Sequence, residues 1–474
     1  MRILLVKPSP RLATIRGLQA FQRLEPLELG YLAAAAGPGH EIRVLDLRLA
    51  WFPARAFARS LARFRPELVG FTGYTHEATA VLQLARQARS ALPAARIVVG
   101  GHHATVAPED FDDPAFDAVV RGEGCAPFRA LVDRAVRGEG FEGIAQVRVP
   151  GTPVPPGEGW PRYPDPATLP APRRDLWSPS DYRSVWLAEG VQAWQPLFPR
   201  VATVRTSYGC RMQCSFCIVP QLSGGVHTPR PVDAVADEIA ALAADHVYFV
   251  DDENFLDEAH GFALAEALAE RGVRKRYFAW TRATTVLRSP ELLRRWREIG
   301  LDAAFLGFEF TRDEELRDAR KGATVAANER ALDTLRAMGV AVHAAFMIRP
   351  ETTERELDRL LAYVRNLPPV QSSFTVCTPS PGTTDYAALA ERFWIDEPRD
   401  LHDCMHPLTR TALPLPEFSR RYAELAAEGT ARTPMRLERR PIRPTDALRV
   451  VRAERAYLKS YRHLFLDYPP ALWA

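Results

Sequence analysis

The feature that most constrains the fold is a regular alternation of short apolar runs with amphipathic helical patterns, which occurs twice along the 474 residues. In residues 1–145 the apolar runs RILLV, EIRVLDL, LVGFTGY, RIVVGG and DAVVRG alternate with helical patterns such as LELGYLAAAA. Apolar strands separated by helices of about 10–15 residues are typical of parallel βαβ units. We therefore predict an open, doubly wound Rossmann-like sheet, a fold that binds ligands at the carboxyl ends of its strands.

A second alternation begins after a segment rich in proline. Residues 146–200 contain GTPVPPGEGWPRYPDPATLPAPRRDLW, in which proline fixes φ and removes backbone donors, so an extended interdomain connection is expected. Residues 201–388 hold about six further strand and helix units, which predict a partial (β/α)6 barrel of parallel strands that need not close. Residues 389–474 are mostly helical and are expected to form a cap. The predicted fold class is therefore α/β with a helical C-terminal region.

Charge and hydropathy exclude several classes of protein. With 61 Lys and Arg against 58 Asp and Glu, the formal net charge of +3 gives no global field that would attract nucleic acid. No apolar run reaches the ~20 residues that span a bilayer, and Pro8 interrupts the first run before a signal peptide could form. We expect a cytoplasmic protein without a transmembrane segment, and leave peripheral contact with a membrane open.

Three of the six cysteines fall within TSYGCRMQCSFCIVP, Thr206 to Pro220. Cys210, Cys214 and Cys217 have the spacing CxxxCxxC and follow the first barrel strand directly, at the end where barrel enzymes place their chemistry. A zinc site would need a fourth ligand, for which His227 is the next candidate. An iron–sulfur cluster held by only three thiolates would leave one iron open to an external ligand.

The motif in this position resembles the radical S-adenosylmethionine superfamily, and Phe216, just before the last cysteine, also fits that pattern. The resemblance implies that Cys210, Cys214 and Cys217 hold a 4Fe-4S cluster and that S-adenosylmethionine chelates the fourth iron. An electron from the cluster, supplied by a donor such as flavodoxin or ferredoxin, would then break the sulfonium bond to give a 5′-deoxyadenosyl radical. The resemblance favours this cluster over a structural zinc. The other cysteines, Cys125, Cys377 and Cys404, are interpreted as ordinary thiols.

The same resemblance assigns cofactor contacts to later strand ends. The stretches FVDDENF, FAWTRA and FLGFEF end three barrel strands with polar residues, although the family's usual Gly-Gly-Glu is absent. The residues expected to bind S-adenosylmethionine are Phe216, Asp251, Asp252, Glu253, Arg282 and Glu309. For each charged residue the alternative is a solvated strand end or a helix cap. Tyr208, beside the first cysteine, is a candidate active-site residue.

The first sheet lacks the GxGxxG of a dinucleotide fold. Instead GFTGYT, VVGGHHAT and VVRGEG follow its third, fourth and fifth strands, and paired glycines let a bulky ligand approach the backbone. These placements resemble the cobalamin-binding domain that precedes many radical enzymes. The expected cobalamin contacts are Thr72, Gly73, Tyr74, Gly100, Gly101, His102, Gly122 and Glu123.

One departure concerns the lower face of cobalt. The Asp-x-His-x-x-Gly motif of cobalamin-dependent mutases is absent after the first strand, where KPSPRLATIRG stands. We therefore expect cobalamin with its own base displaced and no imidazole from this loop. His76, His102 and His103 lie on later loops and are expected beside the nucleotide tail or solvent rather than on cobalt.

Together these features resemble class B cobalamin-dependent radical methyltransferases, with KPSP, RLEPLELGYLAAAA and DLHDCMHPLTRTALPLPEFSRRYAEL closest to hopanoid C-3 methylase-like proteins. The resemblance implies methyl transfer from methylcobalamin to an unactivated carbon of a small, lipidic or polycyclic substrate. A cobalamin-dependent cyclase or oxidative rearrangement enzyme without methyl transfer is one alternative, and a cobalamin-binding sensor with a structural cluster is another. RNA modification is disfavoured because no basic RNA-binding module is appended. The basic aromatic stretch RAYLKSYRHLF is interpreted as part of a packed cap in preference to a membrane contact.

Overall fold

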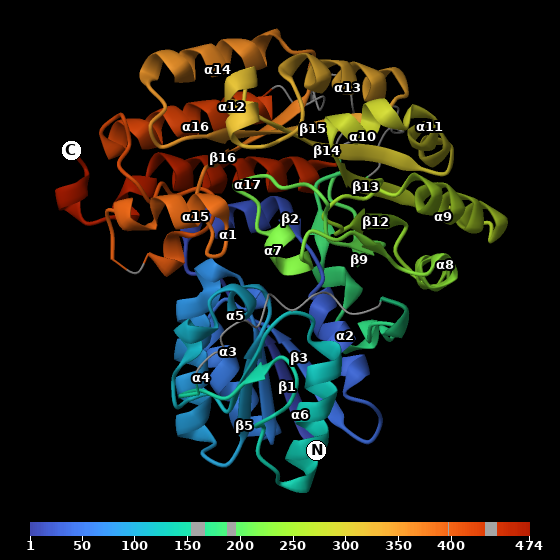
Figure 1. Ribbon diagram of the computed structural model, residues 1–474, viewed down its shortest axis with the longest axis vertical. Coiled ribbons are helices and arrows are strands. Elements are labelled where there is room, and N and C mark those ends of the chain that lie inside the picture. Colours follow the sequence, from blue (N-terminus) through green and yellow to red (C-terminus); the bar gives the residue numbers. More distant parts are fainter. Residues whose placement is uncertain (153–165, 187–195, 397, 432–442) are drawn as a thin grey trace.

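The computed structural model describes residues 1–152, 166–186, 196–396, 398–431 and 443–474. Two parallel sheets lie one above the other, with the N-terminal domain below and the second sheet with the C-terminal helices above (Figure 1). The predicted fold class is thus confirmed. The predicted domain boundaries stay predictions.

The N-terminal sheet has the strand order β3-β1-β4-β5-β6-β7, in which only β7 runs antiparallel to its neighbour. Its strands are β1 (Arg2–Lys7), β3 (Glu41–Asp46), β4 (Leu68–Thr72), β5 (Arg96–Gly100), β6 (Ala118–Val120) and β7 (Val147–Arg148). Its helices are α2 (Leu27–Ala35), α3 (Pro53–Phe64), α4 (Ala78–Ala91), α5 (His102–Val106) and α6 (Cys125–Arg137). Phe57 of α3 and Val81 of α4 pack on one face, while Leu29 of α2 and Phe128 of α6 pack on the other. Because both faces are covered, the strands are nearly continuous apolar runs.

One helix after β1 was not predicted. The segment following this strand forms α1 (Ala13–Phe21), which leaves the N-terminal domain and packs against α17 (Pro444–Arg462) at the other end of the chain. The rings of Phe21 and Tyr457 meet edge to face at 5.7 Å between centroids. Gly17 allows this close approach, because a Cβ there would lie 3.1 Å from the Tyr457 Cα. The apolar spacing of Leu12, Ile15 and Leu18 carried the signal for this helix.

The second sheet has the strand order β16-β15-β14-β13-β12-β9, and all six strands are parallel. Its strands are β9 (Val201–Val204), β12 (His246–Phe249), β13 (Arg276–Thr281), β14 (Leu301–Glu309), β15 (Ala341–Ile348) and β16 (Gln371–Val376). The helices along it are α8 (Val232–Ala240), α9 (Glu258–Glu270), α10 (Ala283–Arg288), α11 (Pro290–Glu298), α12 (Asp313–Asp318), α13 (Val325–Ala337) and α14 (Glu354–Asn366). Within the described residues β9 and β16 do not pair, so the sheet is the predicted partial barrel with an open side.

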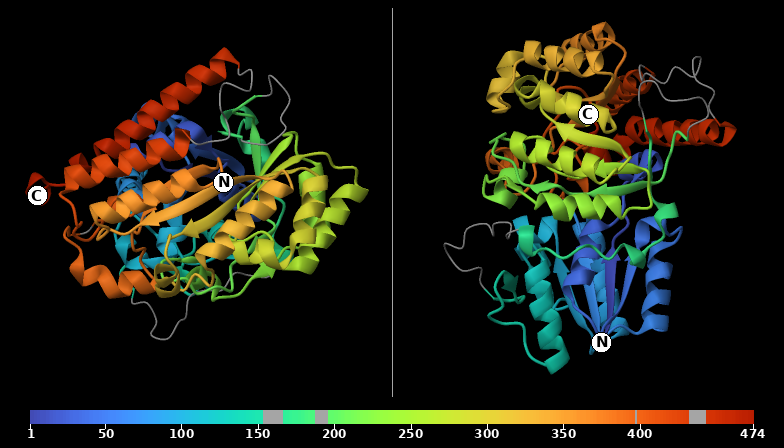
Figure 2. Two further views of the ribbon diagram at one scale, coloured as in Figure 1. Left: turned by 90° about the horizontal axis from the view of Figure 1, so that it is seen from above. Right: turned by 90° about the vertical axis from the view of Figure 1, so that its right-hand side faces the viewer.

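The C-terminal helices cover the edge of this barrel (Figure 2). Helix α15 (Thr384–Leu389) follows β16, and α16 (Leu415–Ala431) packs on β16 and on α17. The Tyr422 hydroxyl donates to the Phe374 carbonyl at 2.8 Å, and Gly429 lies where a Cβ would collide with the Ser372 carbonyl oxygen. The predicted mostly helical C-terminal region is therefore confirmed, and its helix α16 covers the edge strand β16.

Within the predicted connection 146–200, residues 153–165 and 187–195 lie outside the described residues. The described parts contact both sheets. Arg174 pairs with Glu25 and Glu238, the Tyr182 hydroxyl donates to Asp46 at 3.2 Å, and β8 (Arg183–Ser184) pairs with β2 (Gln22–Arg23). The helices of the described residues are all too short or too polar to cross a bilayer.

A buried histidine joins three distant segments of the cap. The Nδ1 of His406 lies 2.9 Å from Asp403 and its Nε2 lies 3.1 Å from Asp467, while Thr14 of α1 donates to Asp403 at 2.7 Å. Burial alone would lower the pKa of His406, but the two carboxylates raise it to about 9. The imidazolium therefore stabilises the contact between α1 and the C-terminal region.

This pKa predicts a pH-dependent stability. Because the folded-state pKa of about 9 lies above the ordinary histidine value of 6.5, the stabilisation is complete below pH 6.5 and is lost as the pH rises through 9. The free energy of unfolding, measured by denaturant titration, should fall over this range by about 3 kcal/mol more in the native protein than in His406→Gln. Parallel pH profiles for the two proteins would contradict the assignment.

Candidate functional site

The cysteine loop follows β9 and is held in place by a short hairpin. Strand β10 (Ser207–Tyr208) pairs antiparallel with β11 (Thr228–Pro229), and α7 (Val219–Ser223) closes the loop. Gly209 has φ +80°, and a Cβ there would lie 2.0 Å from the Val226 carbonyl oxygen, so only glycine fits. Cys210 and Cys214 are buried, Cys217 is partly exposed, and all three are free thiols. Burial raises the pKa of Cys217 to about 12, so a cationic partner is needed to hold its thiolate.

The loop does not form a site for a single metal ion. Within the part of the chain that the structure describes, no three His, Cys, Asp or Glu side chains are arranged to hold one ion, and His227 does not join the cysteines. Both ring nitrogens of His227 are buried without a partner in the described residues, and burial lowers its pKa to about 4. A 4Fe-4S cluster makes a different demand, because each thiolate binds a different iron. The three free thiols on one loop therefore fit a cluster better than zinc.

Two aspartates after β12 support this loop. Asp251 is buried and accepts hydrogen bonds from the backbone and hydroxyl groups of Thr206 and Ser207, at 2.5–3.0 Å. Asp252 accepts from the Gly209 backbone at 2.9 Å. Burial raises the pKa of Asp251, so these donors are what stabilise its charge. Both carboxylates thus fix the path of the chain into the cysteine motif, whichever cofactor contacts they also make.

Glu253 and Arg282 lie at the open side of the cysteine loop. The Arg282 Nη1 is 3.5 Å from the Cys214 Sγ, and the Arg282 backbone N–H donates to Glu253 at 3.3 Å. Both side chains are buried. The Arg282 Nε and the neighbouring Asn254 Nδ2 are buried without a partner in the described residues. Donors left unpaired beside the thiols fit the carboxylate and other acceptors of a bound S-adenosylmethionine.

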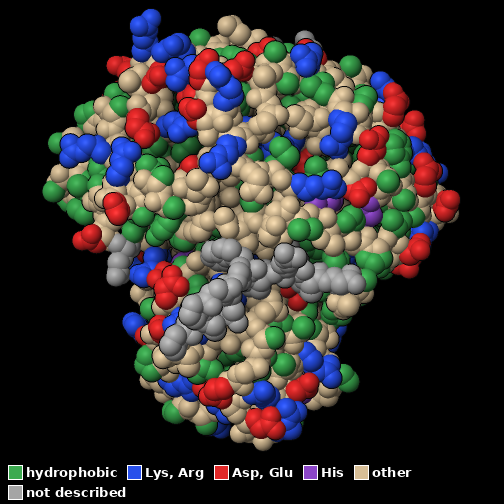
Figure 3. Space-filling model, viewed as in Figure 1, with side chains coloured by type: hydrophobic (Ala, Val, Ile, Leu, Met, Phe, Trp, Pro, Cys, Tyr) green, Lys and Arg blue, Asp and Glu red, His purple; other side chains and the backbone are tan. Residues whose placement is uncertain are grey.

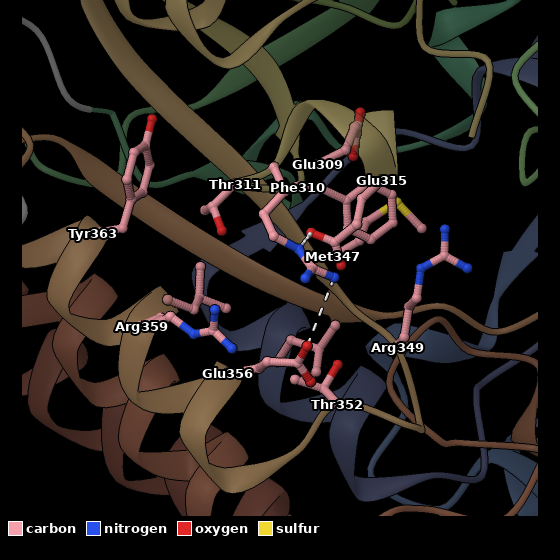
Figure 4. A pocket seen from close by; sticks show the side chains of 13 residues that line it. Glu309, Phe310, Thr311, Glu315, Met347, Arg349, Thr352, Glu356, Arg359 and Tyr363 are labelled. Carbon is pink, nitrogen blue, oxygen red and sulfur yellow. Dashed lines mark hydrogen bonds and ion pairs between the residues drawn. The ribbon is translucent and has the colours of Figure 1, made fainter. Parts of the chain in front are cut away.

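Glu309 occupies a strained position at the end of β14. Its φ is +62°, and its Oε1 lies 2.5 Å from the Lys321 Nζ. The backbone carbonyl of Lys321 in turn accepts a hydrogen bond from the Arg282 guanidinium. Glu309 also lines a pocket of about 240 Å³ between the ends of β14 and β15 and helix α14, together with Phe310, Met347 and Arg349 (Figure 4). Phe216 and Met347 both pack against the buried cluster of Phe310, Leu316 and Ala319, so apolar side chains link the cysteine loop to the wall of this pocket.

Tyr208 lies between the cysteine loop and the N-terminal domain. It is buried, and the Arg205 guanidinium lies 4.9 Å from its ring centroid. Burial raises its pKa, and Tyr31 of α2 and Cys125 of α6 raise it further. The side chain is therefore a neutral phenol at the junction of the two domains. Its role in the reaction stays a prediction.

The residues expected to bind cobalamin lie together at the carboxyl ends of β4, β5 and β6. Gly101 has φ +93°, and a Cβ there would lie 2.5 Å from the Thr72 Oγ1 and 3.2 Å from the Gly73 nitrogen, so the loops after β4 and β5 touch. Gly122 donates to Thr105 at 2.9 Å, and Glu123 accepts from the first backbone N–H of α6 at 2.8 Å. Gly100 ends β5 itself. This glycine-rich edge leaves backbone open to a large ligand.

Aromatic rings cover the same edge. Tyr74 is 50% exposed, stacks on His76 at 5.9 Å and meets His102 edge-on at 5.4 Å. The Lys7 Nζ lies 4.9 Å from the Tyr74 centroid. The His102 Nε2 is buried without a partner in the described residues, and burial lowers the pKa of this imidazole to about 4. An exposed ring, a neutral imidazole and bare glycine backbone together fit a large, planar macrocycle.

A cavity of about 480 Å³ joins the two domains. Its walls come from loops after β4 and β5, including Thr75 and His103, and from the segment after β16, including Gly382 and Arg399. Arg399 binds both oxygens of Asp110 at 2.6 Å, and the His103 Nε2 lies 3.0 Å from Asp110. Although burial would raise it, the pKa of Asp110 is lowered by Arg399 and His103. No sequence pattern indicated this contact, because its partners are 289 residues apart.

Known protein families match both halves of the chain. The B12-binding domain family matches residues 14–132, and the radical SAM superfamily matches residues 204–364. The hopanoid C-3 methylase of Methylococcus capsulatus is 30% identical over 431 residues, which cover 90% of this chain and 79% of that protein. An anaerobic magnesium-protoporphyrin IX monomethyl ester cyclase of Rubrivivax gelatinosus is 26% identical, over 83% of this chain and 70% of that protein.

Solved structures agree in fold. The radical S-adenosylmethionine methyltransferase TsrM from Kitasatospora setae, with cobalamin and a 4Fe-4S cluster bound, matches with a TM-score of 0.59 and 21% identity, over 82% of this chain and 78% of its own. The cobalamin-dependent S-adenosylmethionine radical enzyme OxsB matches with a TM-score of 0.60 and 16% identity, over 79% of this chain. The present chain spans 53% of OxsB. Both likenesses concern the fold alone.

Proposed function

This chain belongs to the cobalamin-dependent radical S-adenosylmethionine methyltransferase family, and we propose that it methylates an unactivated carbon of a polycyclic, apolar small molecule. Its cofactors are a 4Fe-4S cluster, S-adenosylmethionine and cobalamin. When bound, the cluster and S-adenosylmethionine supply a hydrogen-abstracting carbon radical, and cobalamin supplies the methyl group. A one-electron donor such as flavodoxin or ferredoxin is also required.

The observation that carries the proposal is the cavity between the two domains. Its walls combine loops at the carboxyl ends of β4 and β5 with the segment after β16, and Asp385 of that segment donates to the Ser215 carbonyl in the cysteine loop at 3.2 Å. A substrate placed here would lie between the domain that carries the glycine-rich edge and the segment that contacts the cysteine loop. The partly buried Arg399–Asp110 ion pair holds the two domains together at this point.

The inner face of the barrel supports an apolar, ring-shaped substrate. One face of the sheet is packed under helices, whereas the other presents aromatic side chains at alternate positions of neighbouring strands. Tyr248 stacks on Phe278 at 4.5 Å, Trp280 lies 4.0 Å from Phe305, and Phe305 lies 5.0 Å from His343. Tyr248 is itself buried, whereas the partly exposed rings of Phe278, Trp280 and Phe305 offer flat apolar surface to a fused-ring molecule. The His343 Nε2 pairs with the Ser373 hydroxyl at 2.8 Å, so the row ends in a polar group that could orient a substrate oxygen.

A radical cyclase is the second candidate function. The 26% identity to the magnesium-protoporphyrin cyclase extends over 83% of this chain, and that substrate is also polycyclic. The aromatic inner face suits both reactions. Only the fate of the methyl group separates them.

The experiment that tests the proposal follows that methyl group. Anaerobically purified, reconstituted protein is incubated with a hopanoid-type pentacyclic substrate, a reductant and S-adenosylmethionine carrying a deuterated methyl group. We expect a product that gains the labelled methyl, together with 5′-deoxyadenosine and S-adenosylhomocysteine, detected by mass spectrometry. A changed but unlabelled product would favour the cyclase.

The variant that tests the position of the substrate is Trp280→Ala. Removing this ring deletes apolar contact worth roughly 2 kcal/mol, so the yield of methylated product should fall more than about tenfold. Formation of 5′-deoxyadenosine without substrate should remain, since the cysteine loop is untouched. Equal yields from both proteins would place the substrate elsewhere.

A further inference from the structure

Helix α17 has one packed side and one open side. It runs along the outer edge of the molecule, as the left-hand view of Figure 2 shows. Ala453, Tyr457, Ser460 and Tyr461 are buried, and Tyr461 meets Tyr422 of α16 at 4.5 Å. These residues repeat at helical spacing, so the aromatic part of RAYLKSYRHLF belongs to the packed cap. The opposite side of the helix is left uncovered by the described residues.

The open side is basic. Arg452, Arg455, Lys459 and Arg462 are exposed and recur every three or four residues, so they lie in one stripe. None of the four forms an ion pair with another of the described residues. The nearest acidic side chain of the helix, Glu454, lies on its flank and accepts a hydrogen bond from Thr430 at 3.1 Å. Four cations on three turns of helix are thus uncompensated by the described carboxylates.

Aliphatic side chains share this stripe. Leu448 is 51% exposed and Val451 40%, and Leu466, just beyond the helix, is 56% exposed. We call Leu448, Val451, Arg452, Arg455, Lys459 and Arg462 the basic face of α17. Single exposed apolar residues need no explanation, but two of them among four cations resemble a helix that lies at a membrane interface.

A second exposed apolar feature follows the edge strand β3. Trp51 is 95% exposed and Phe52 66%, and Arg55 lies over the Phe52 ring at 5.3 Å. A tryptophan so fully exposed is unusual in a folded domain, whereas tryptophan is enriched at membrane interfaces. We call Trp51 and Phe52 the aromatic turn.

A series of contacts links the start of α17 to strand β3, which precedes the aromatic turn. Asp446, at the start of α17, accepts from the Leu197 backbone at 3.0 Å, and Arg449 lies over the Phe198 ring at 5.3 Å. Arg200 and Arg183 form an isolated antiparallel β-bridge through their backbones. The hydroxyl of the adjacent Tyr182 donates a hydrogen bond to Asp46 at the end of β3. The aromatic turn and the start of α17 therefore flank the same connection segment.

We propose that the basic face of α17 and the aromatic turn dock the protein onto the surface of a bilayer containing anionic lipid. Cations supply electrostatic attraction to the headgroups, while Leu448, Val451, Trp51 and Phe52 enter the interface. The aliphatic residues in the stripe and the absence of exposed stacking rings on α17 argue against nucleic acid. On the opposite side, the face in Figure 3 mixes basic and acidic side chains with no large region of one sign. The inference deepens the proposed function, since an apolar substrate would be drawn from the bilayer.

Vesicle sedimentation tests the proposal. The reconstituted full chain is mixed with vesicles of phosphatidylglycerol and phosphatidylcholine, or of phosphatidylcholine alone, and the bound fraction is measured after centrifugation. We expect binding to the anionic vesicles that weakens as salt rises. Neutralising Arg452, Arg455, Lys459 and Arg462 to glutamine should weaken the partition coefficient by about 50-fold or more. The double change Trp51→Ser with Phe52→Ser should weaken it about tenfold, with the salt dependence retained.

A matched control tests whether vesicle binding depends on the basic face of α17 or only on the net charge of the protein. Arg317, Arg330, Arg355 and Arg359 are exposed on α12, α13 and α14, and changing them to glutamine removes the same charge from another region. This variant should bind vesicles within about twofold of the native chain. Equal losses from both quadruple variants, no binding of the native chain, or competition of a DNA duplex for the same face would overturn the proposal. Because sedimentation needs no turnover, and methylation can be measured on detergent-dispersed substrate, failure of one proposal leaves the other standing.

Discussion

Replacing Cys214 with alanine is expected to abolish 5′-deoxyadenosine formation, with a loss of about 1,000-fold or more. Cys214 is buried, and its sulfur lies 3.5 Å from the Arg282 guanidinium. Removing one of three thiolates leaves a second iron without a protein ligand, so the cluster should be lost or labile. Iron and sulfide content, the visible absorption of the cluster, and 5′-deoxyadenosine after reduction measure the effect.

The control for this experiment is Cys404→Ala. Cys404 is an exposed cysteine in the segment after β16 and is not part of the motif. Its variant should keep iron, sulfide and 5′-deoxyadenosine at native levels. Bound cobalamin should be unchanged in both variants, because the cysteine loop and the glycine-rich edge belong to different domains. A Cys214→Ala protein that still makes 5′-deoxyadenosine at the native rate would exclude the cluster assignment.

The sequence predicts the long elements well because local pattern determines them. Strands such as β4 and β5 are buried on both faces and read as apolar runs, and helices such as α4 have one apolar side. Helix α1 was missed, although its apolar spacing is helical. Its packing partner α17 lies more than 400 residues further along the chain, and the loop after a first strand is usually part of its own domain.

The candidate site likewise combines features that the local sequence predicts with features that depend on the assembled fold. The cysteine motif was found because its spacing is local, and the glycines because they follow strands. The sequence could not distinguish the role of Asp251 from the roles of the neighbouring acidic residues. In the structure the Asp251 carboxylate accepts hydrogen bonds from the hydroxyl groups of Thr206 and Ser207. That role depends on β12 lying beside β9, which only the assembled sheet brings about. Likewise, the cavity walls from β5 and β16 meet only after the two domains dock.

Gly101→Ala is expected to weaken cobalamin binding by about 100-fold. Its backbone has φ +93° and ψ −162°, a region that is almost exclusive to glycine and costs other residues about 1–3 kcal/mol. A Cβ would also lie 2.5 Å from the Thr72 Oγ1, so the loops after β4 and β5 would be forced apart. Those loops carry the expected cobalamin contacts. Absorbance titration of the reconstituted protein with cobalamin measures the affinity.

Gly143→Ala is the control that distinguishes the effect of backbone strain from the effect of a collision between the added Cβ and a neighbouring loop. Gly143 lies in the same domain with φ +75°, and a Cβ there meets nothing within 4 Å. This variant bears the cost of an unfavourable φ, about 1 kcal/mol, but disturbs no loop at the cofactor edge. It should lose some thermal stability and bind cobalamin as the native protein does. Native affinity in Gly101→Ala, or equal losses in both variants, would mean that the contact between the two loops does not shape the cobalamin site.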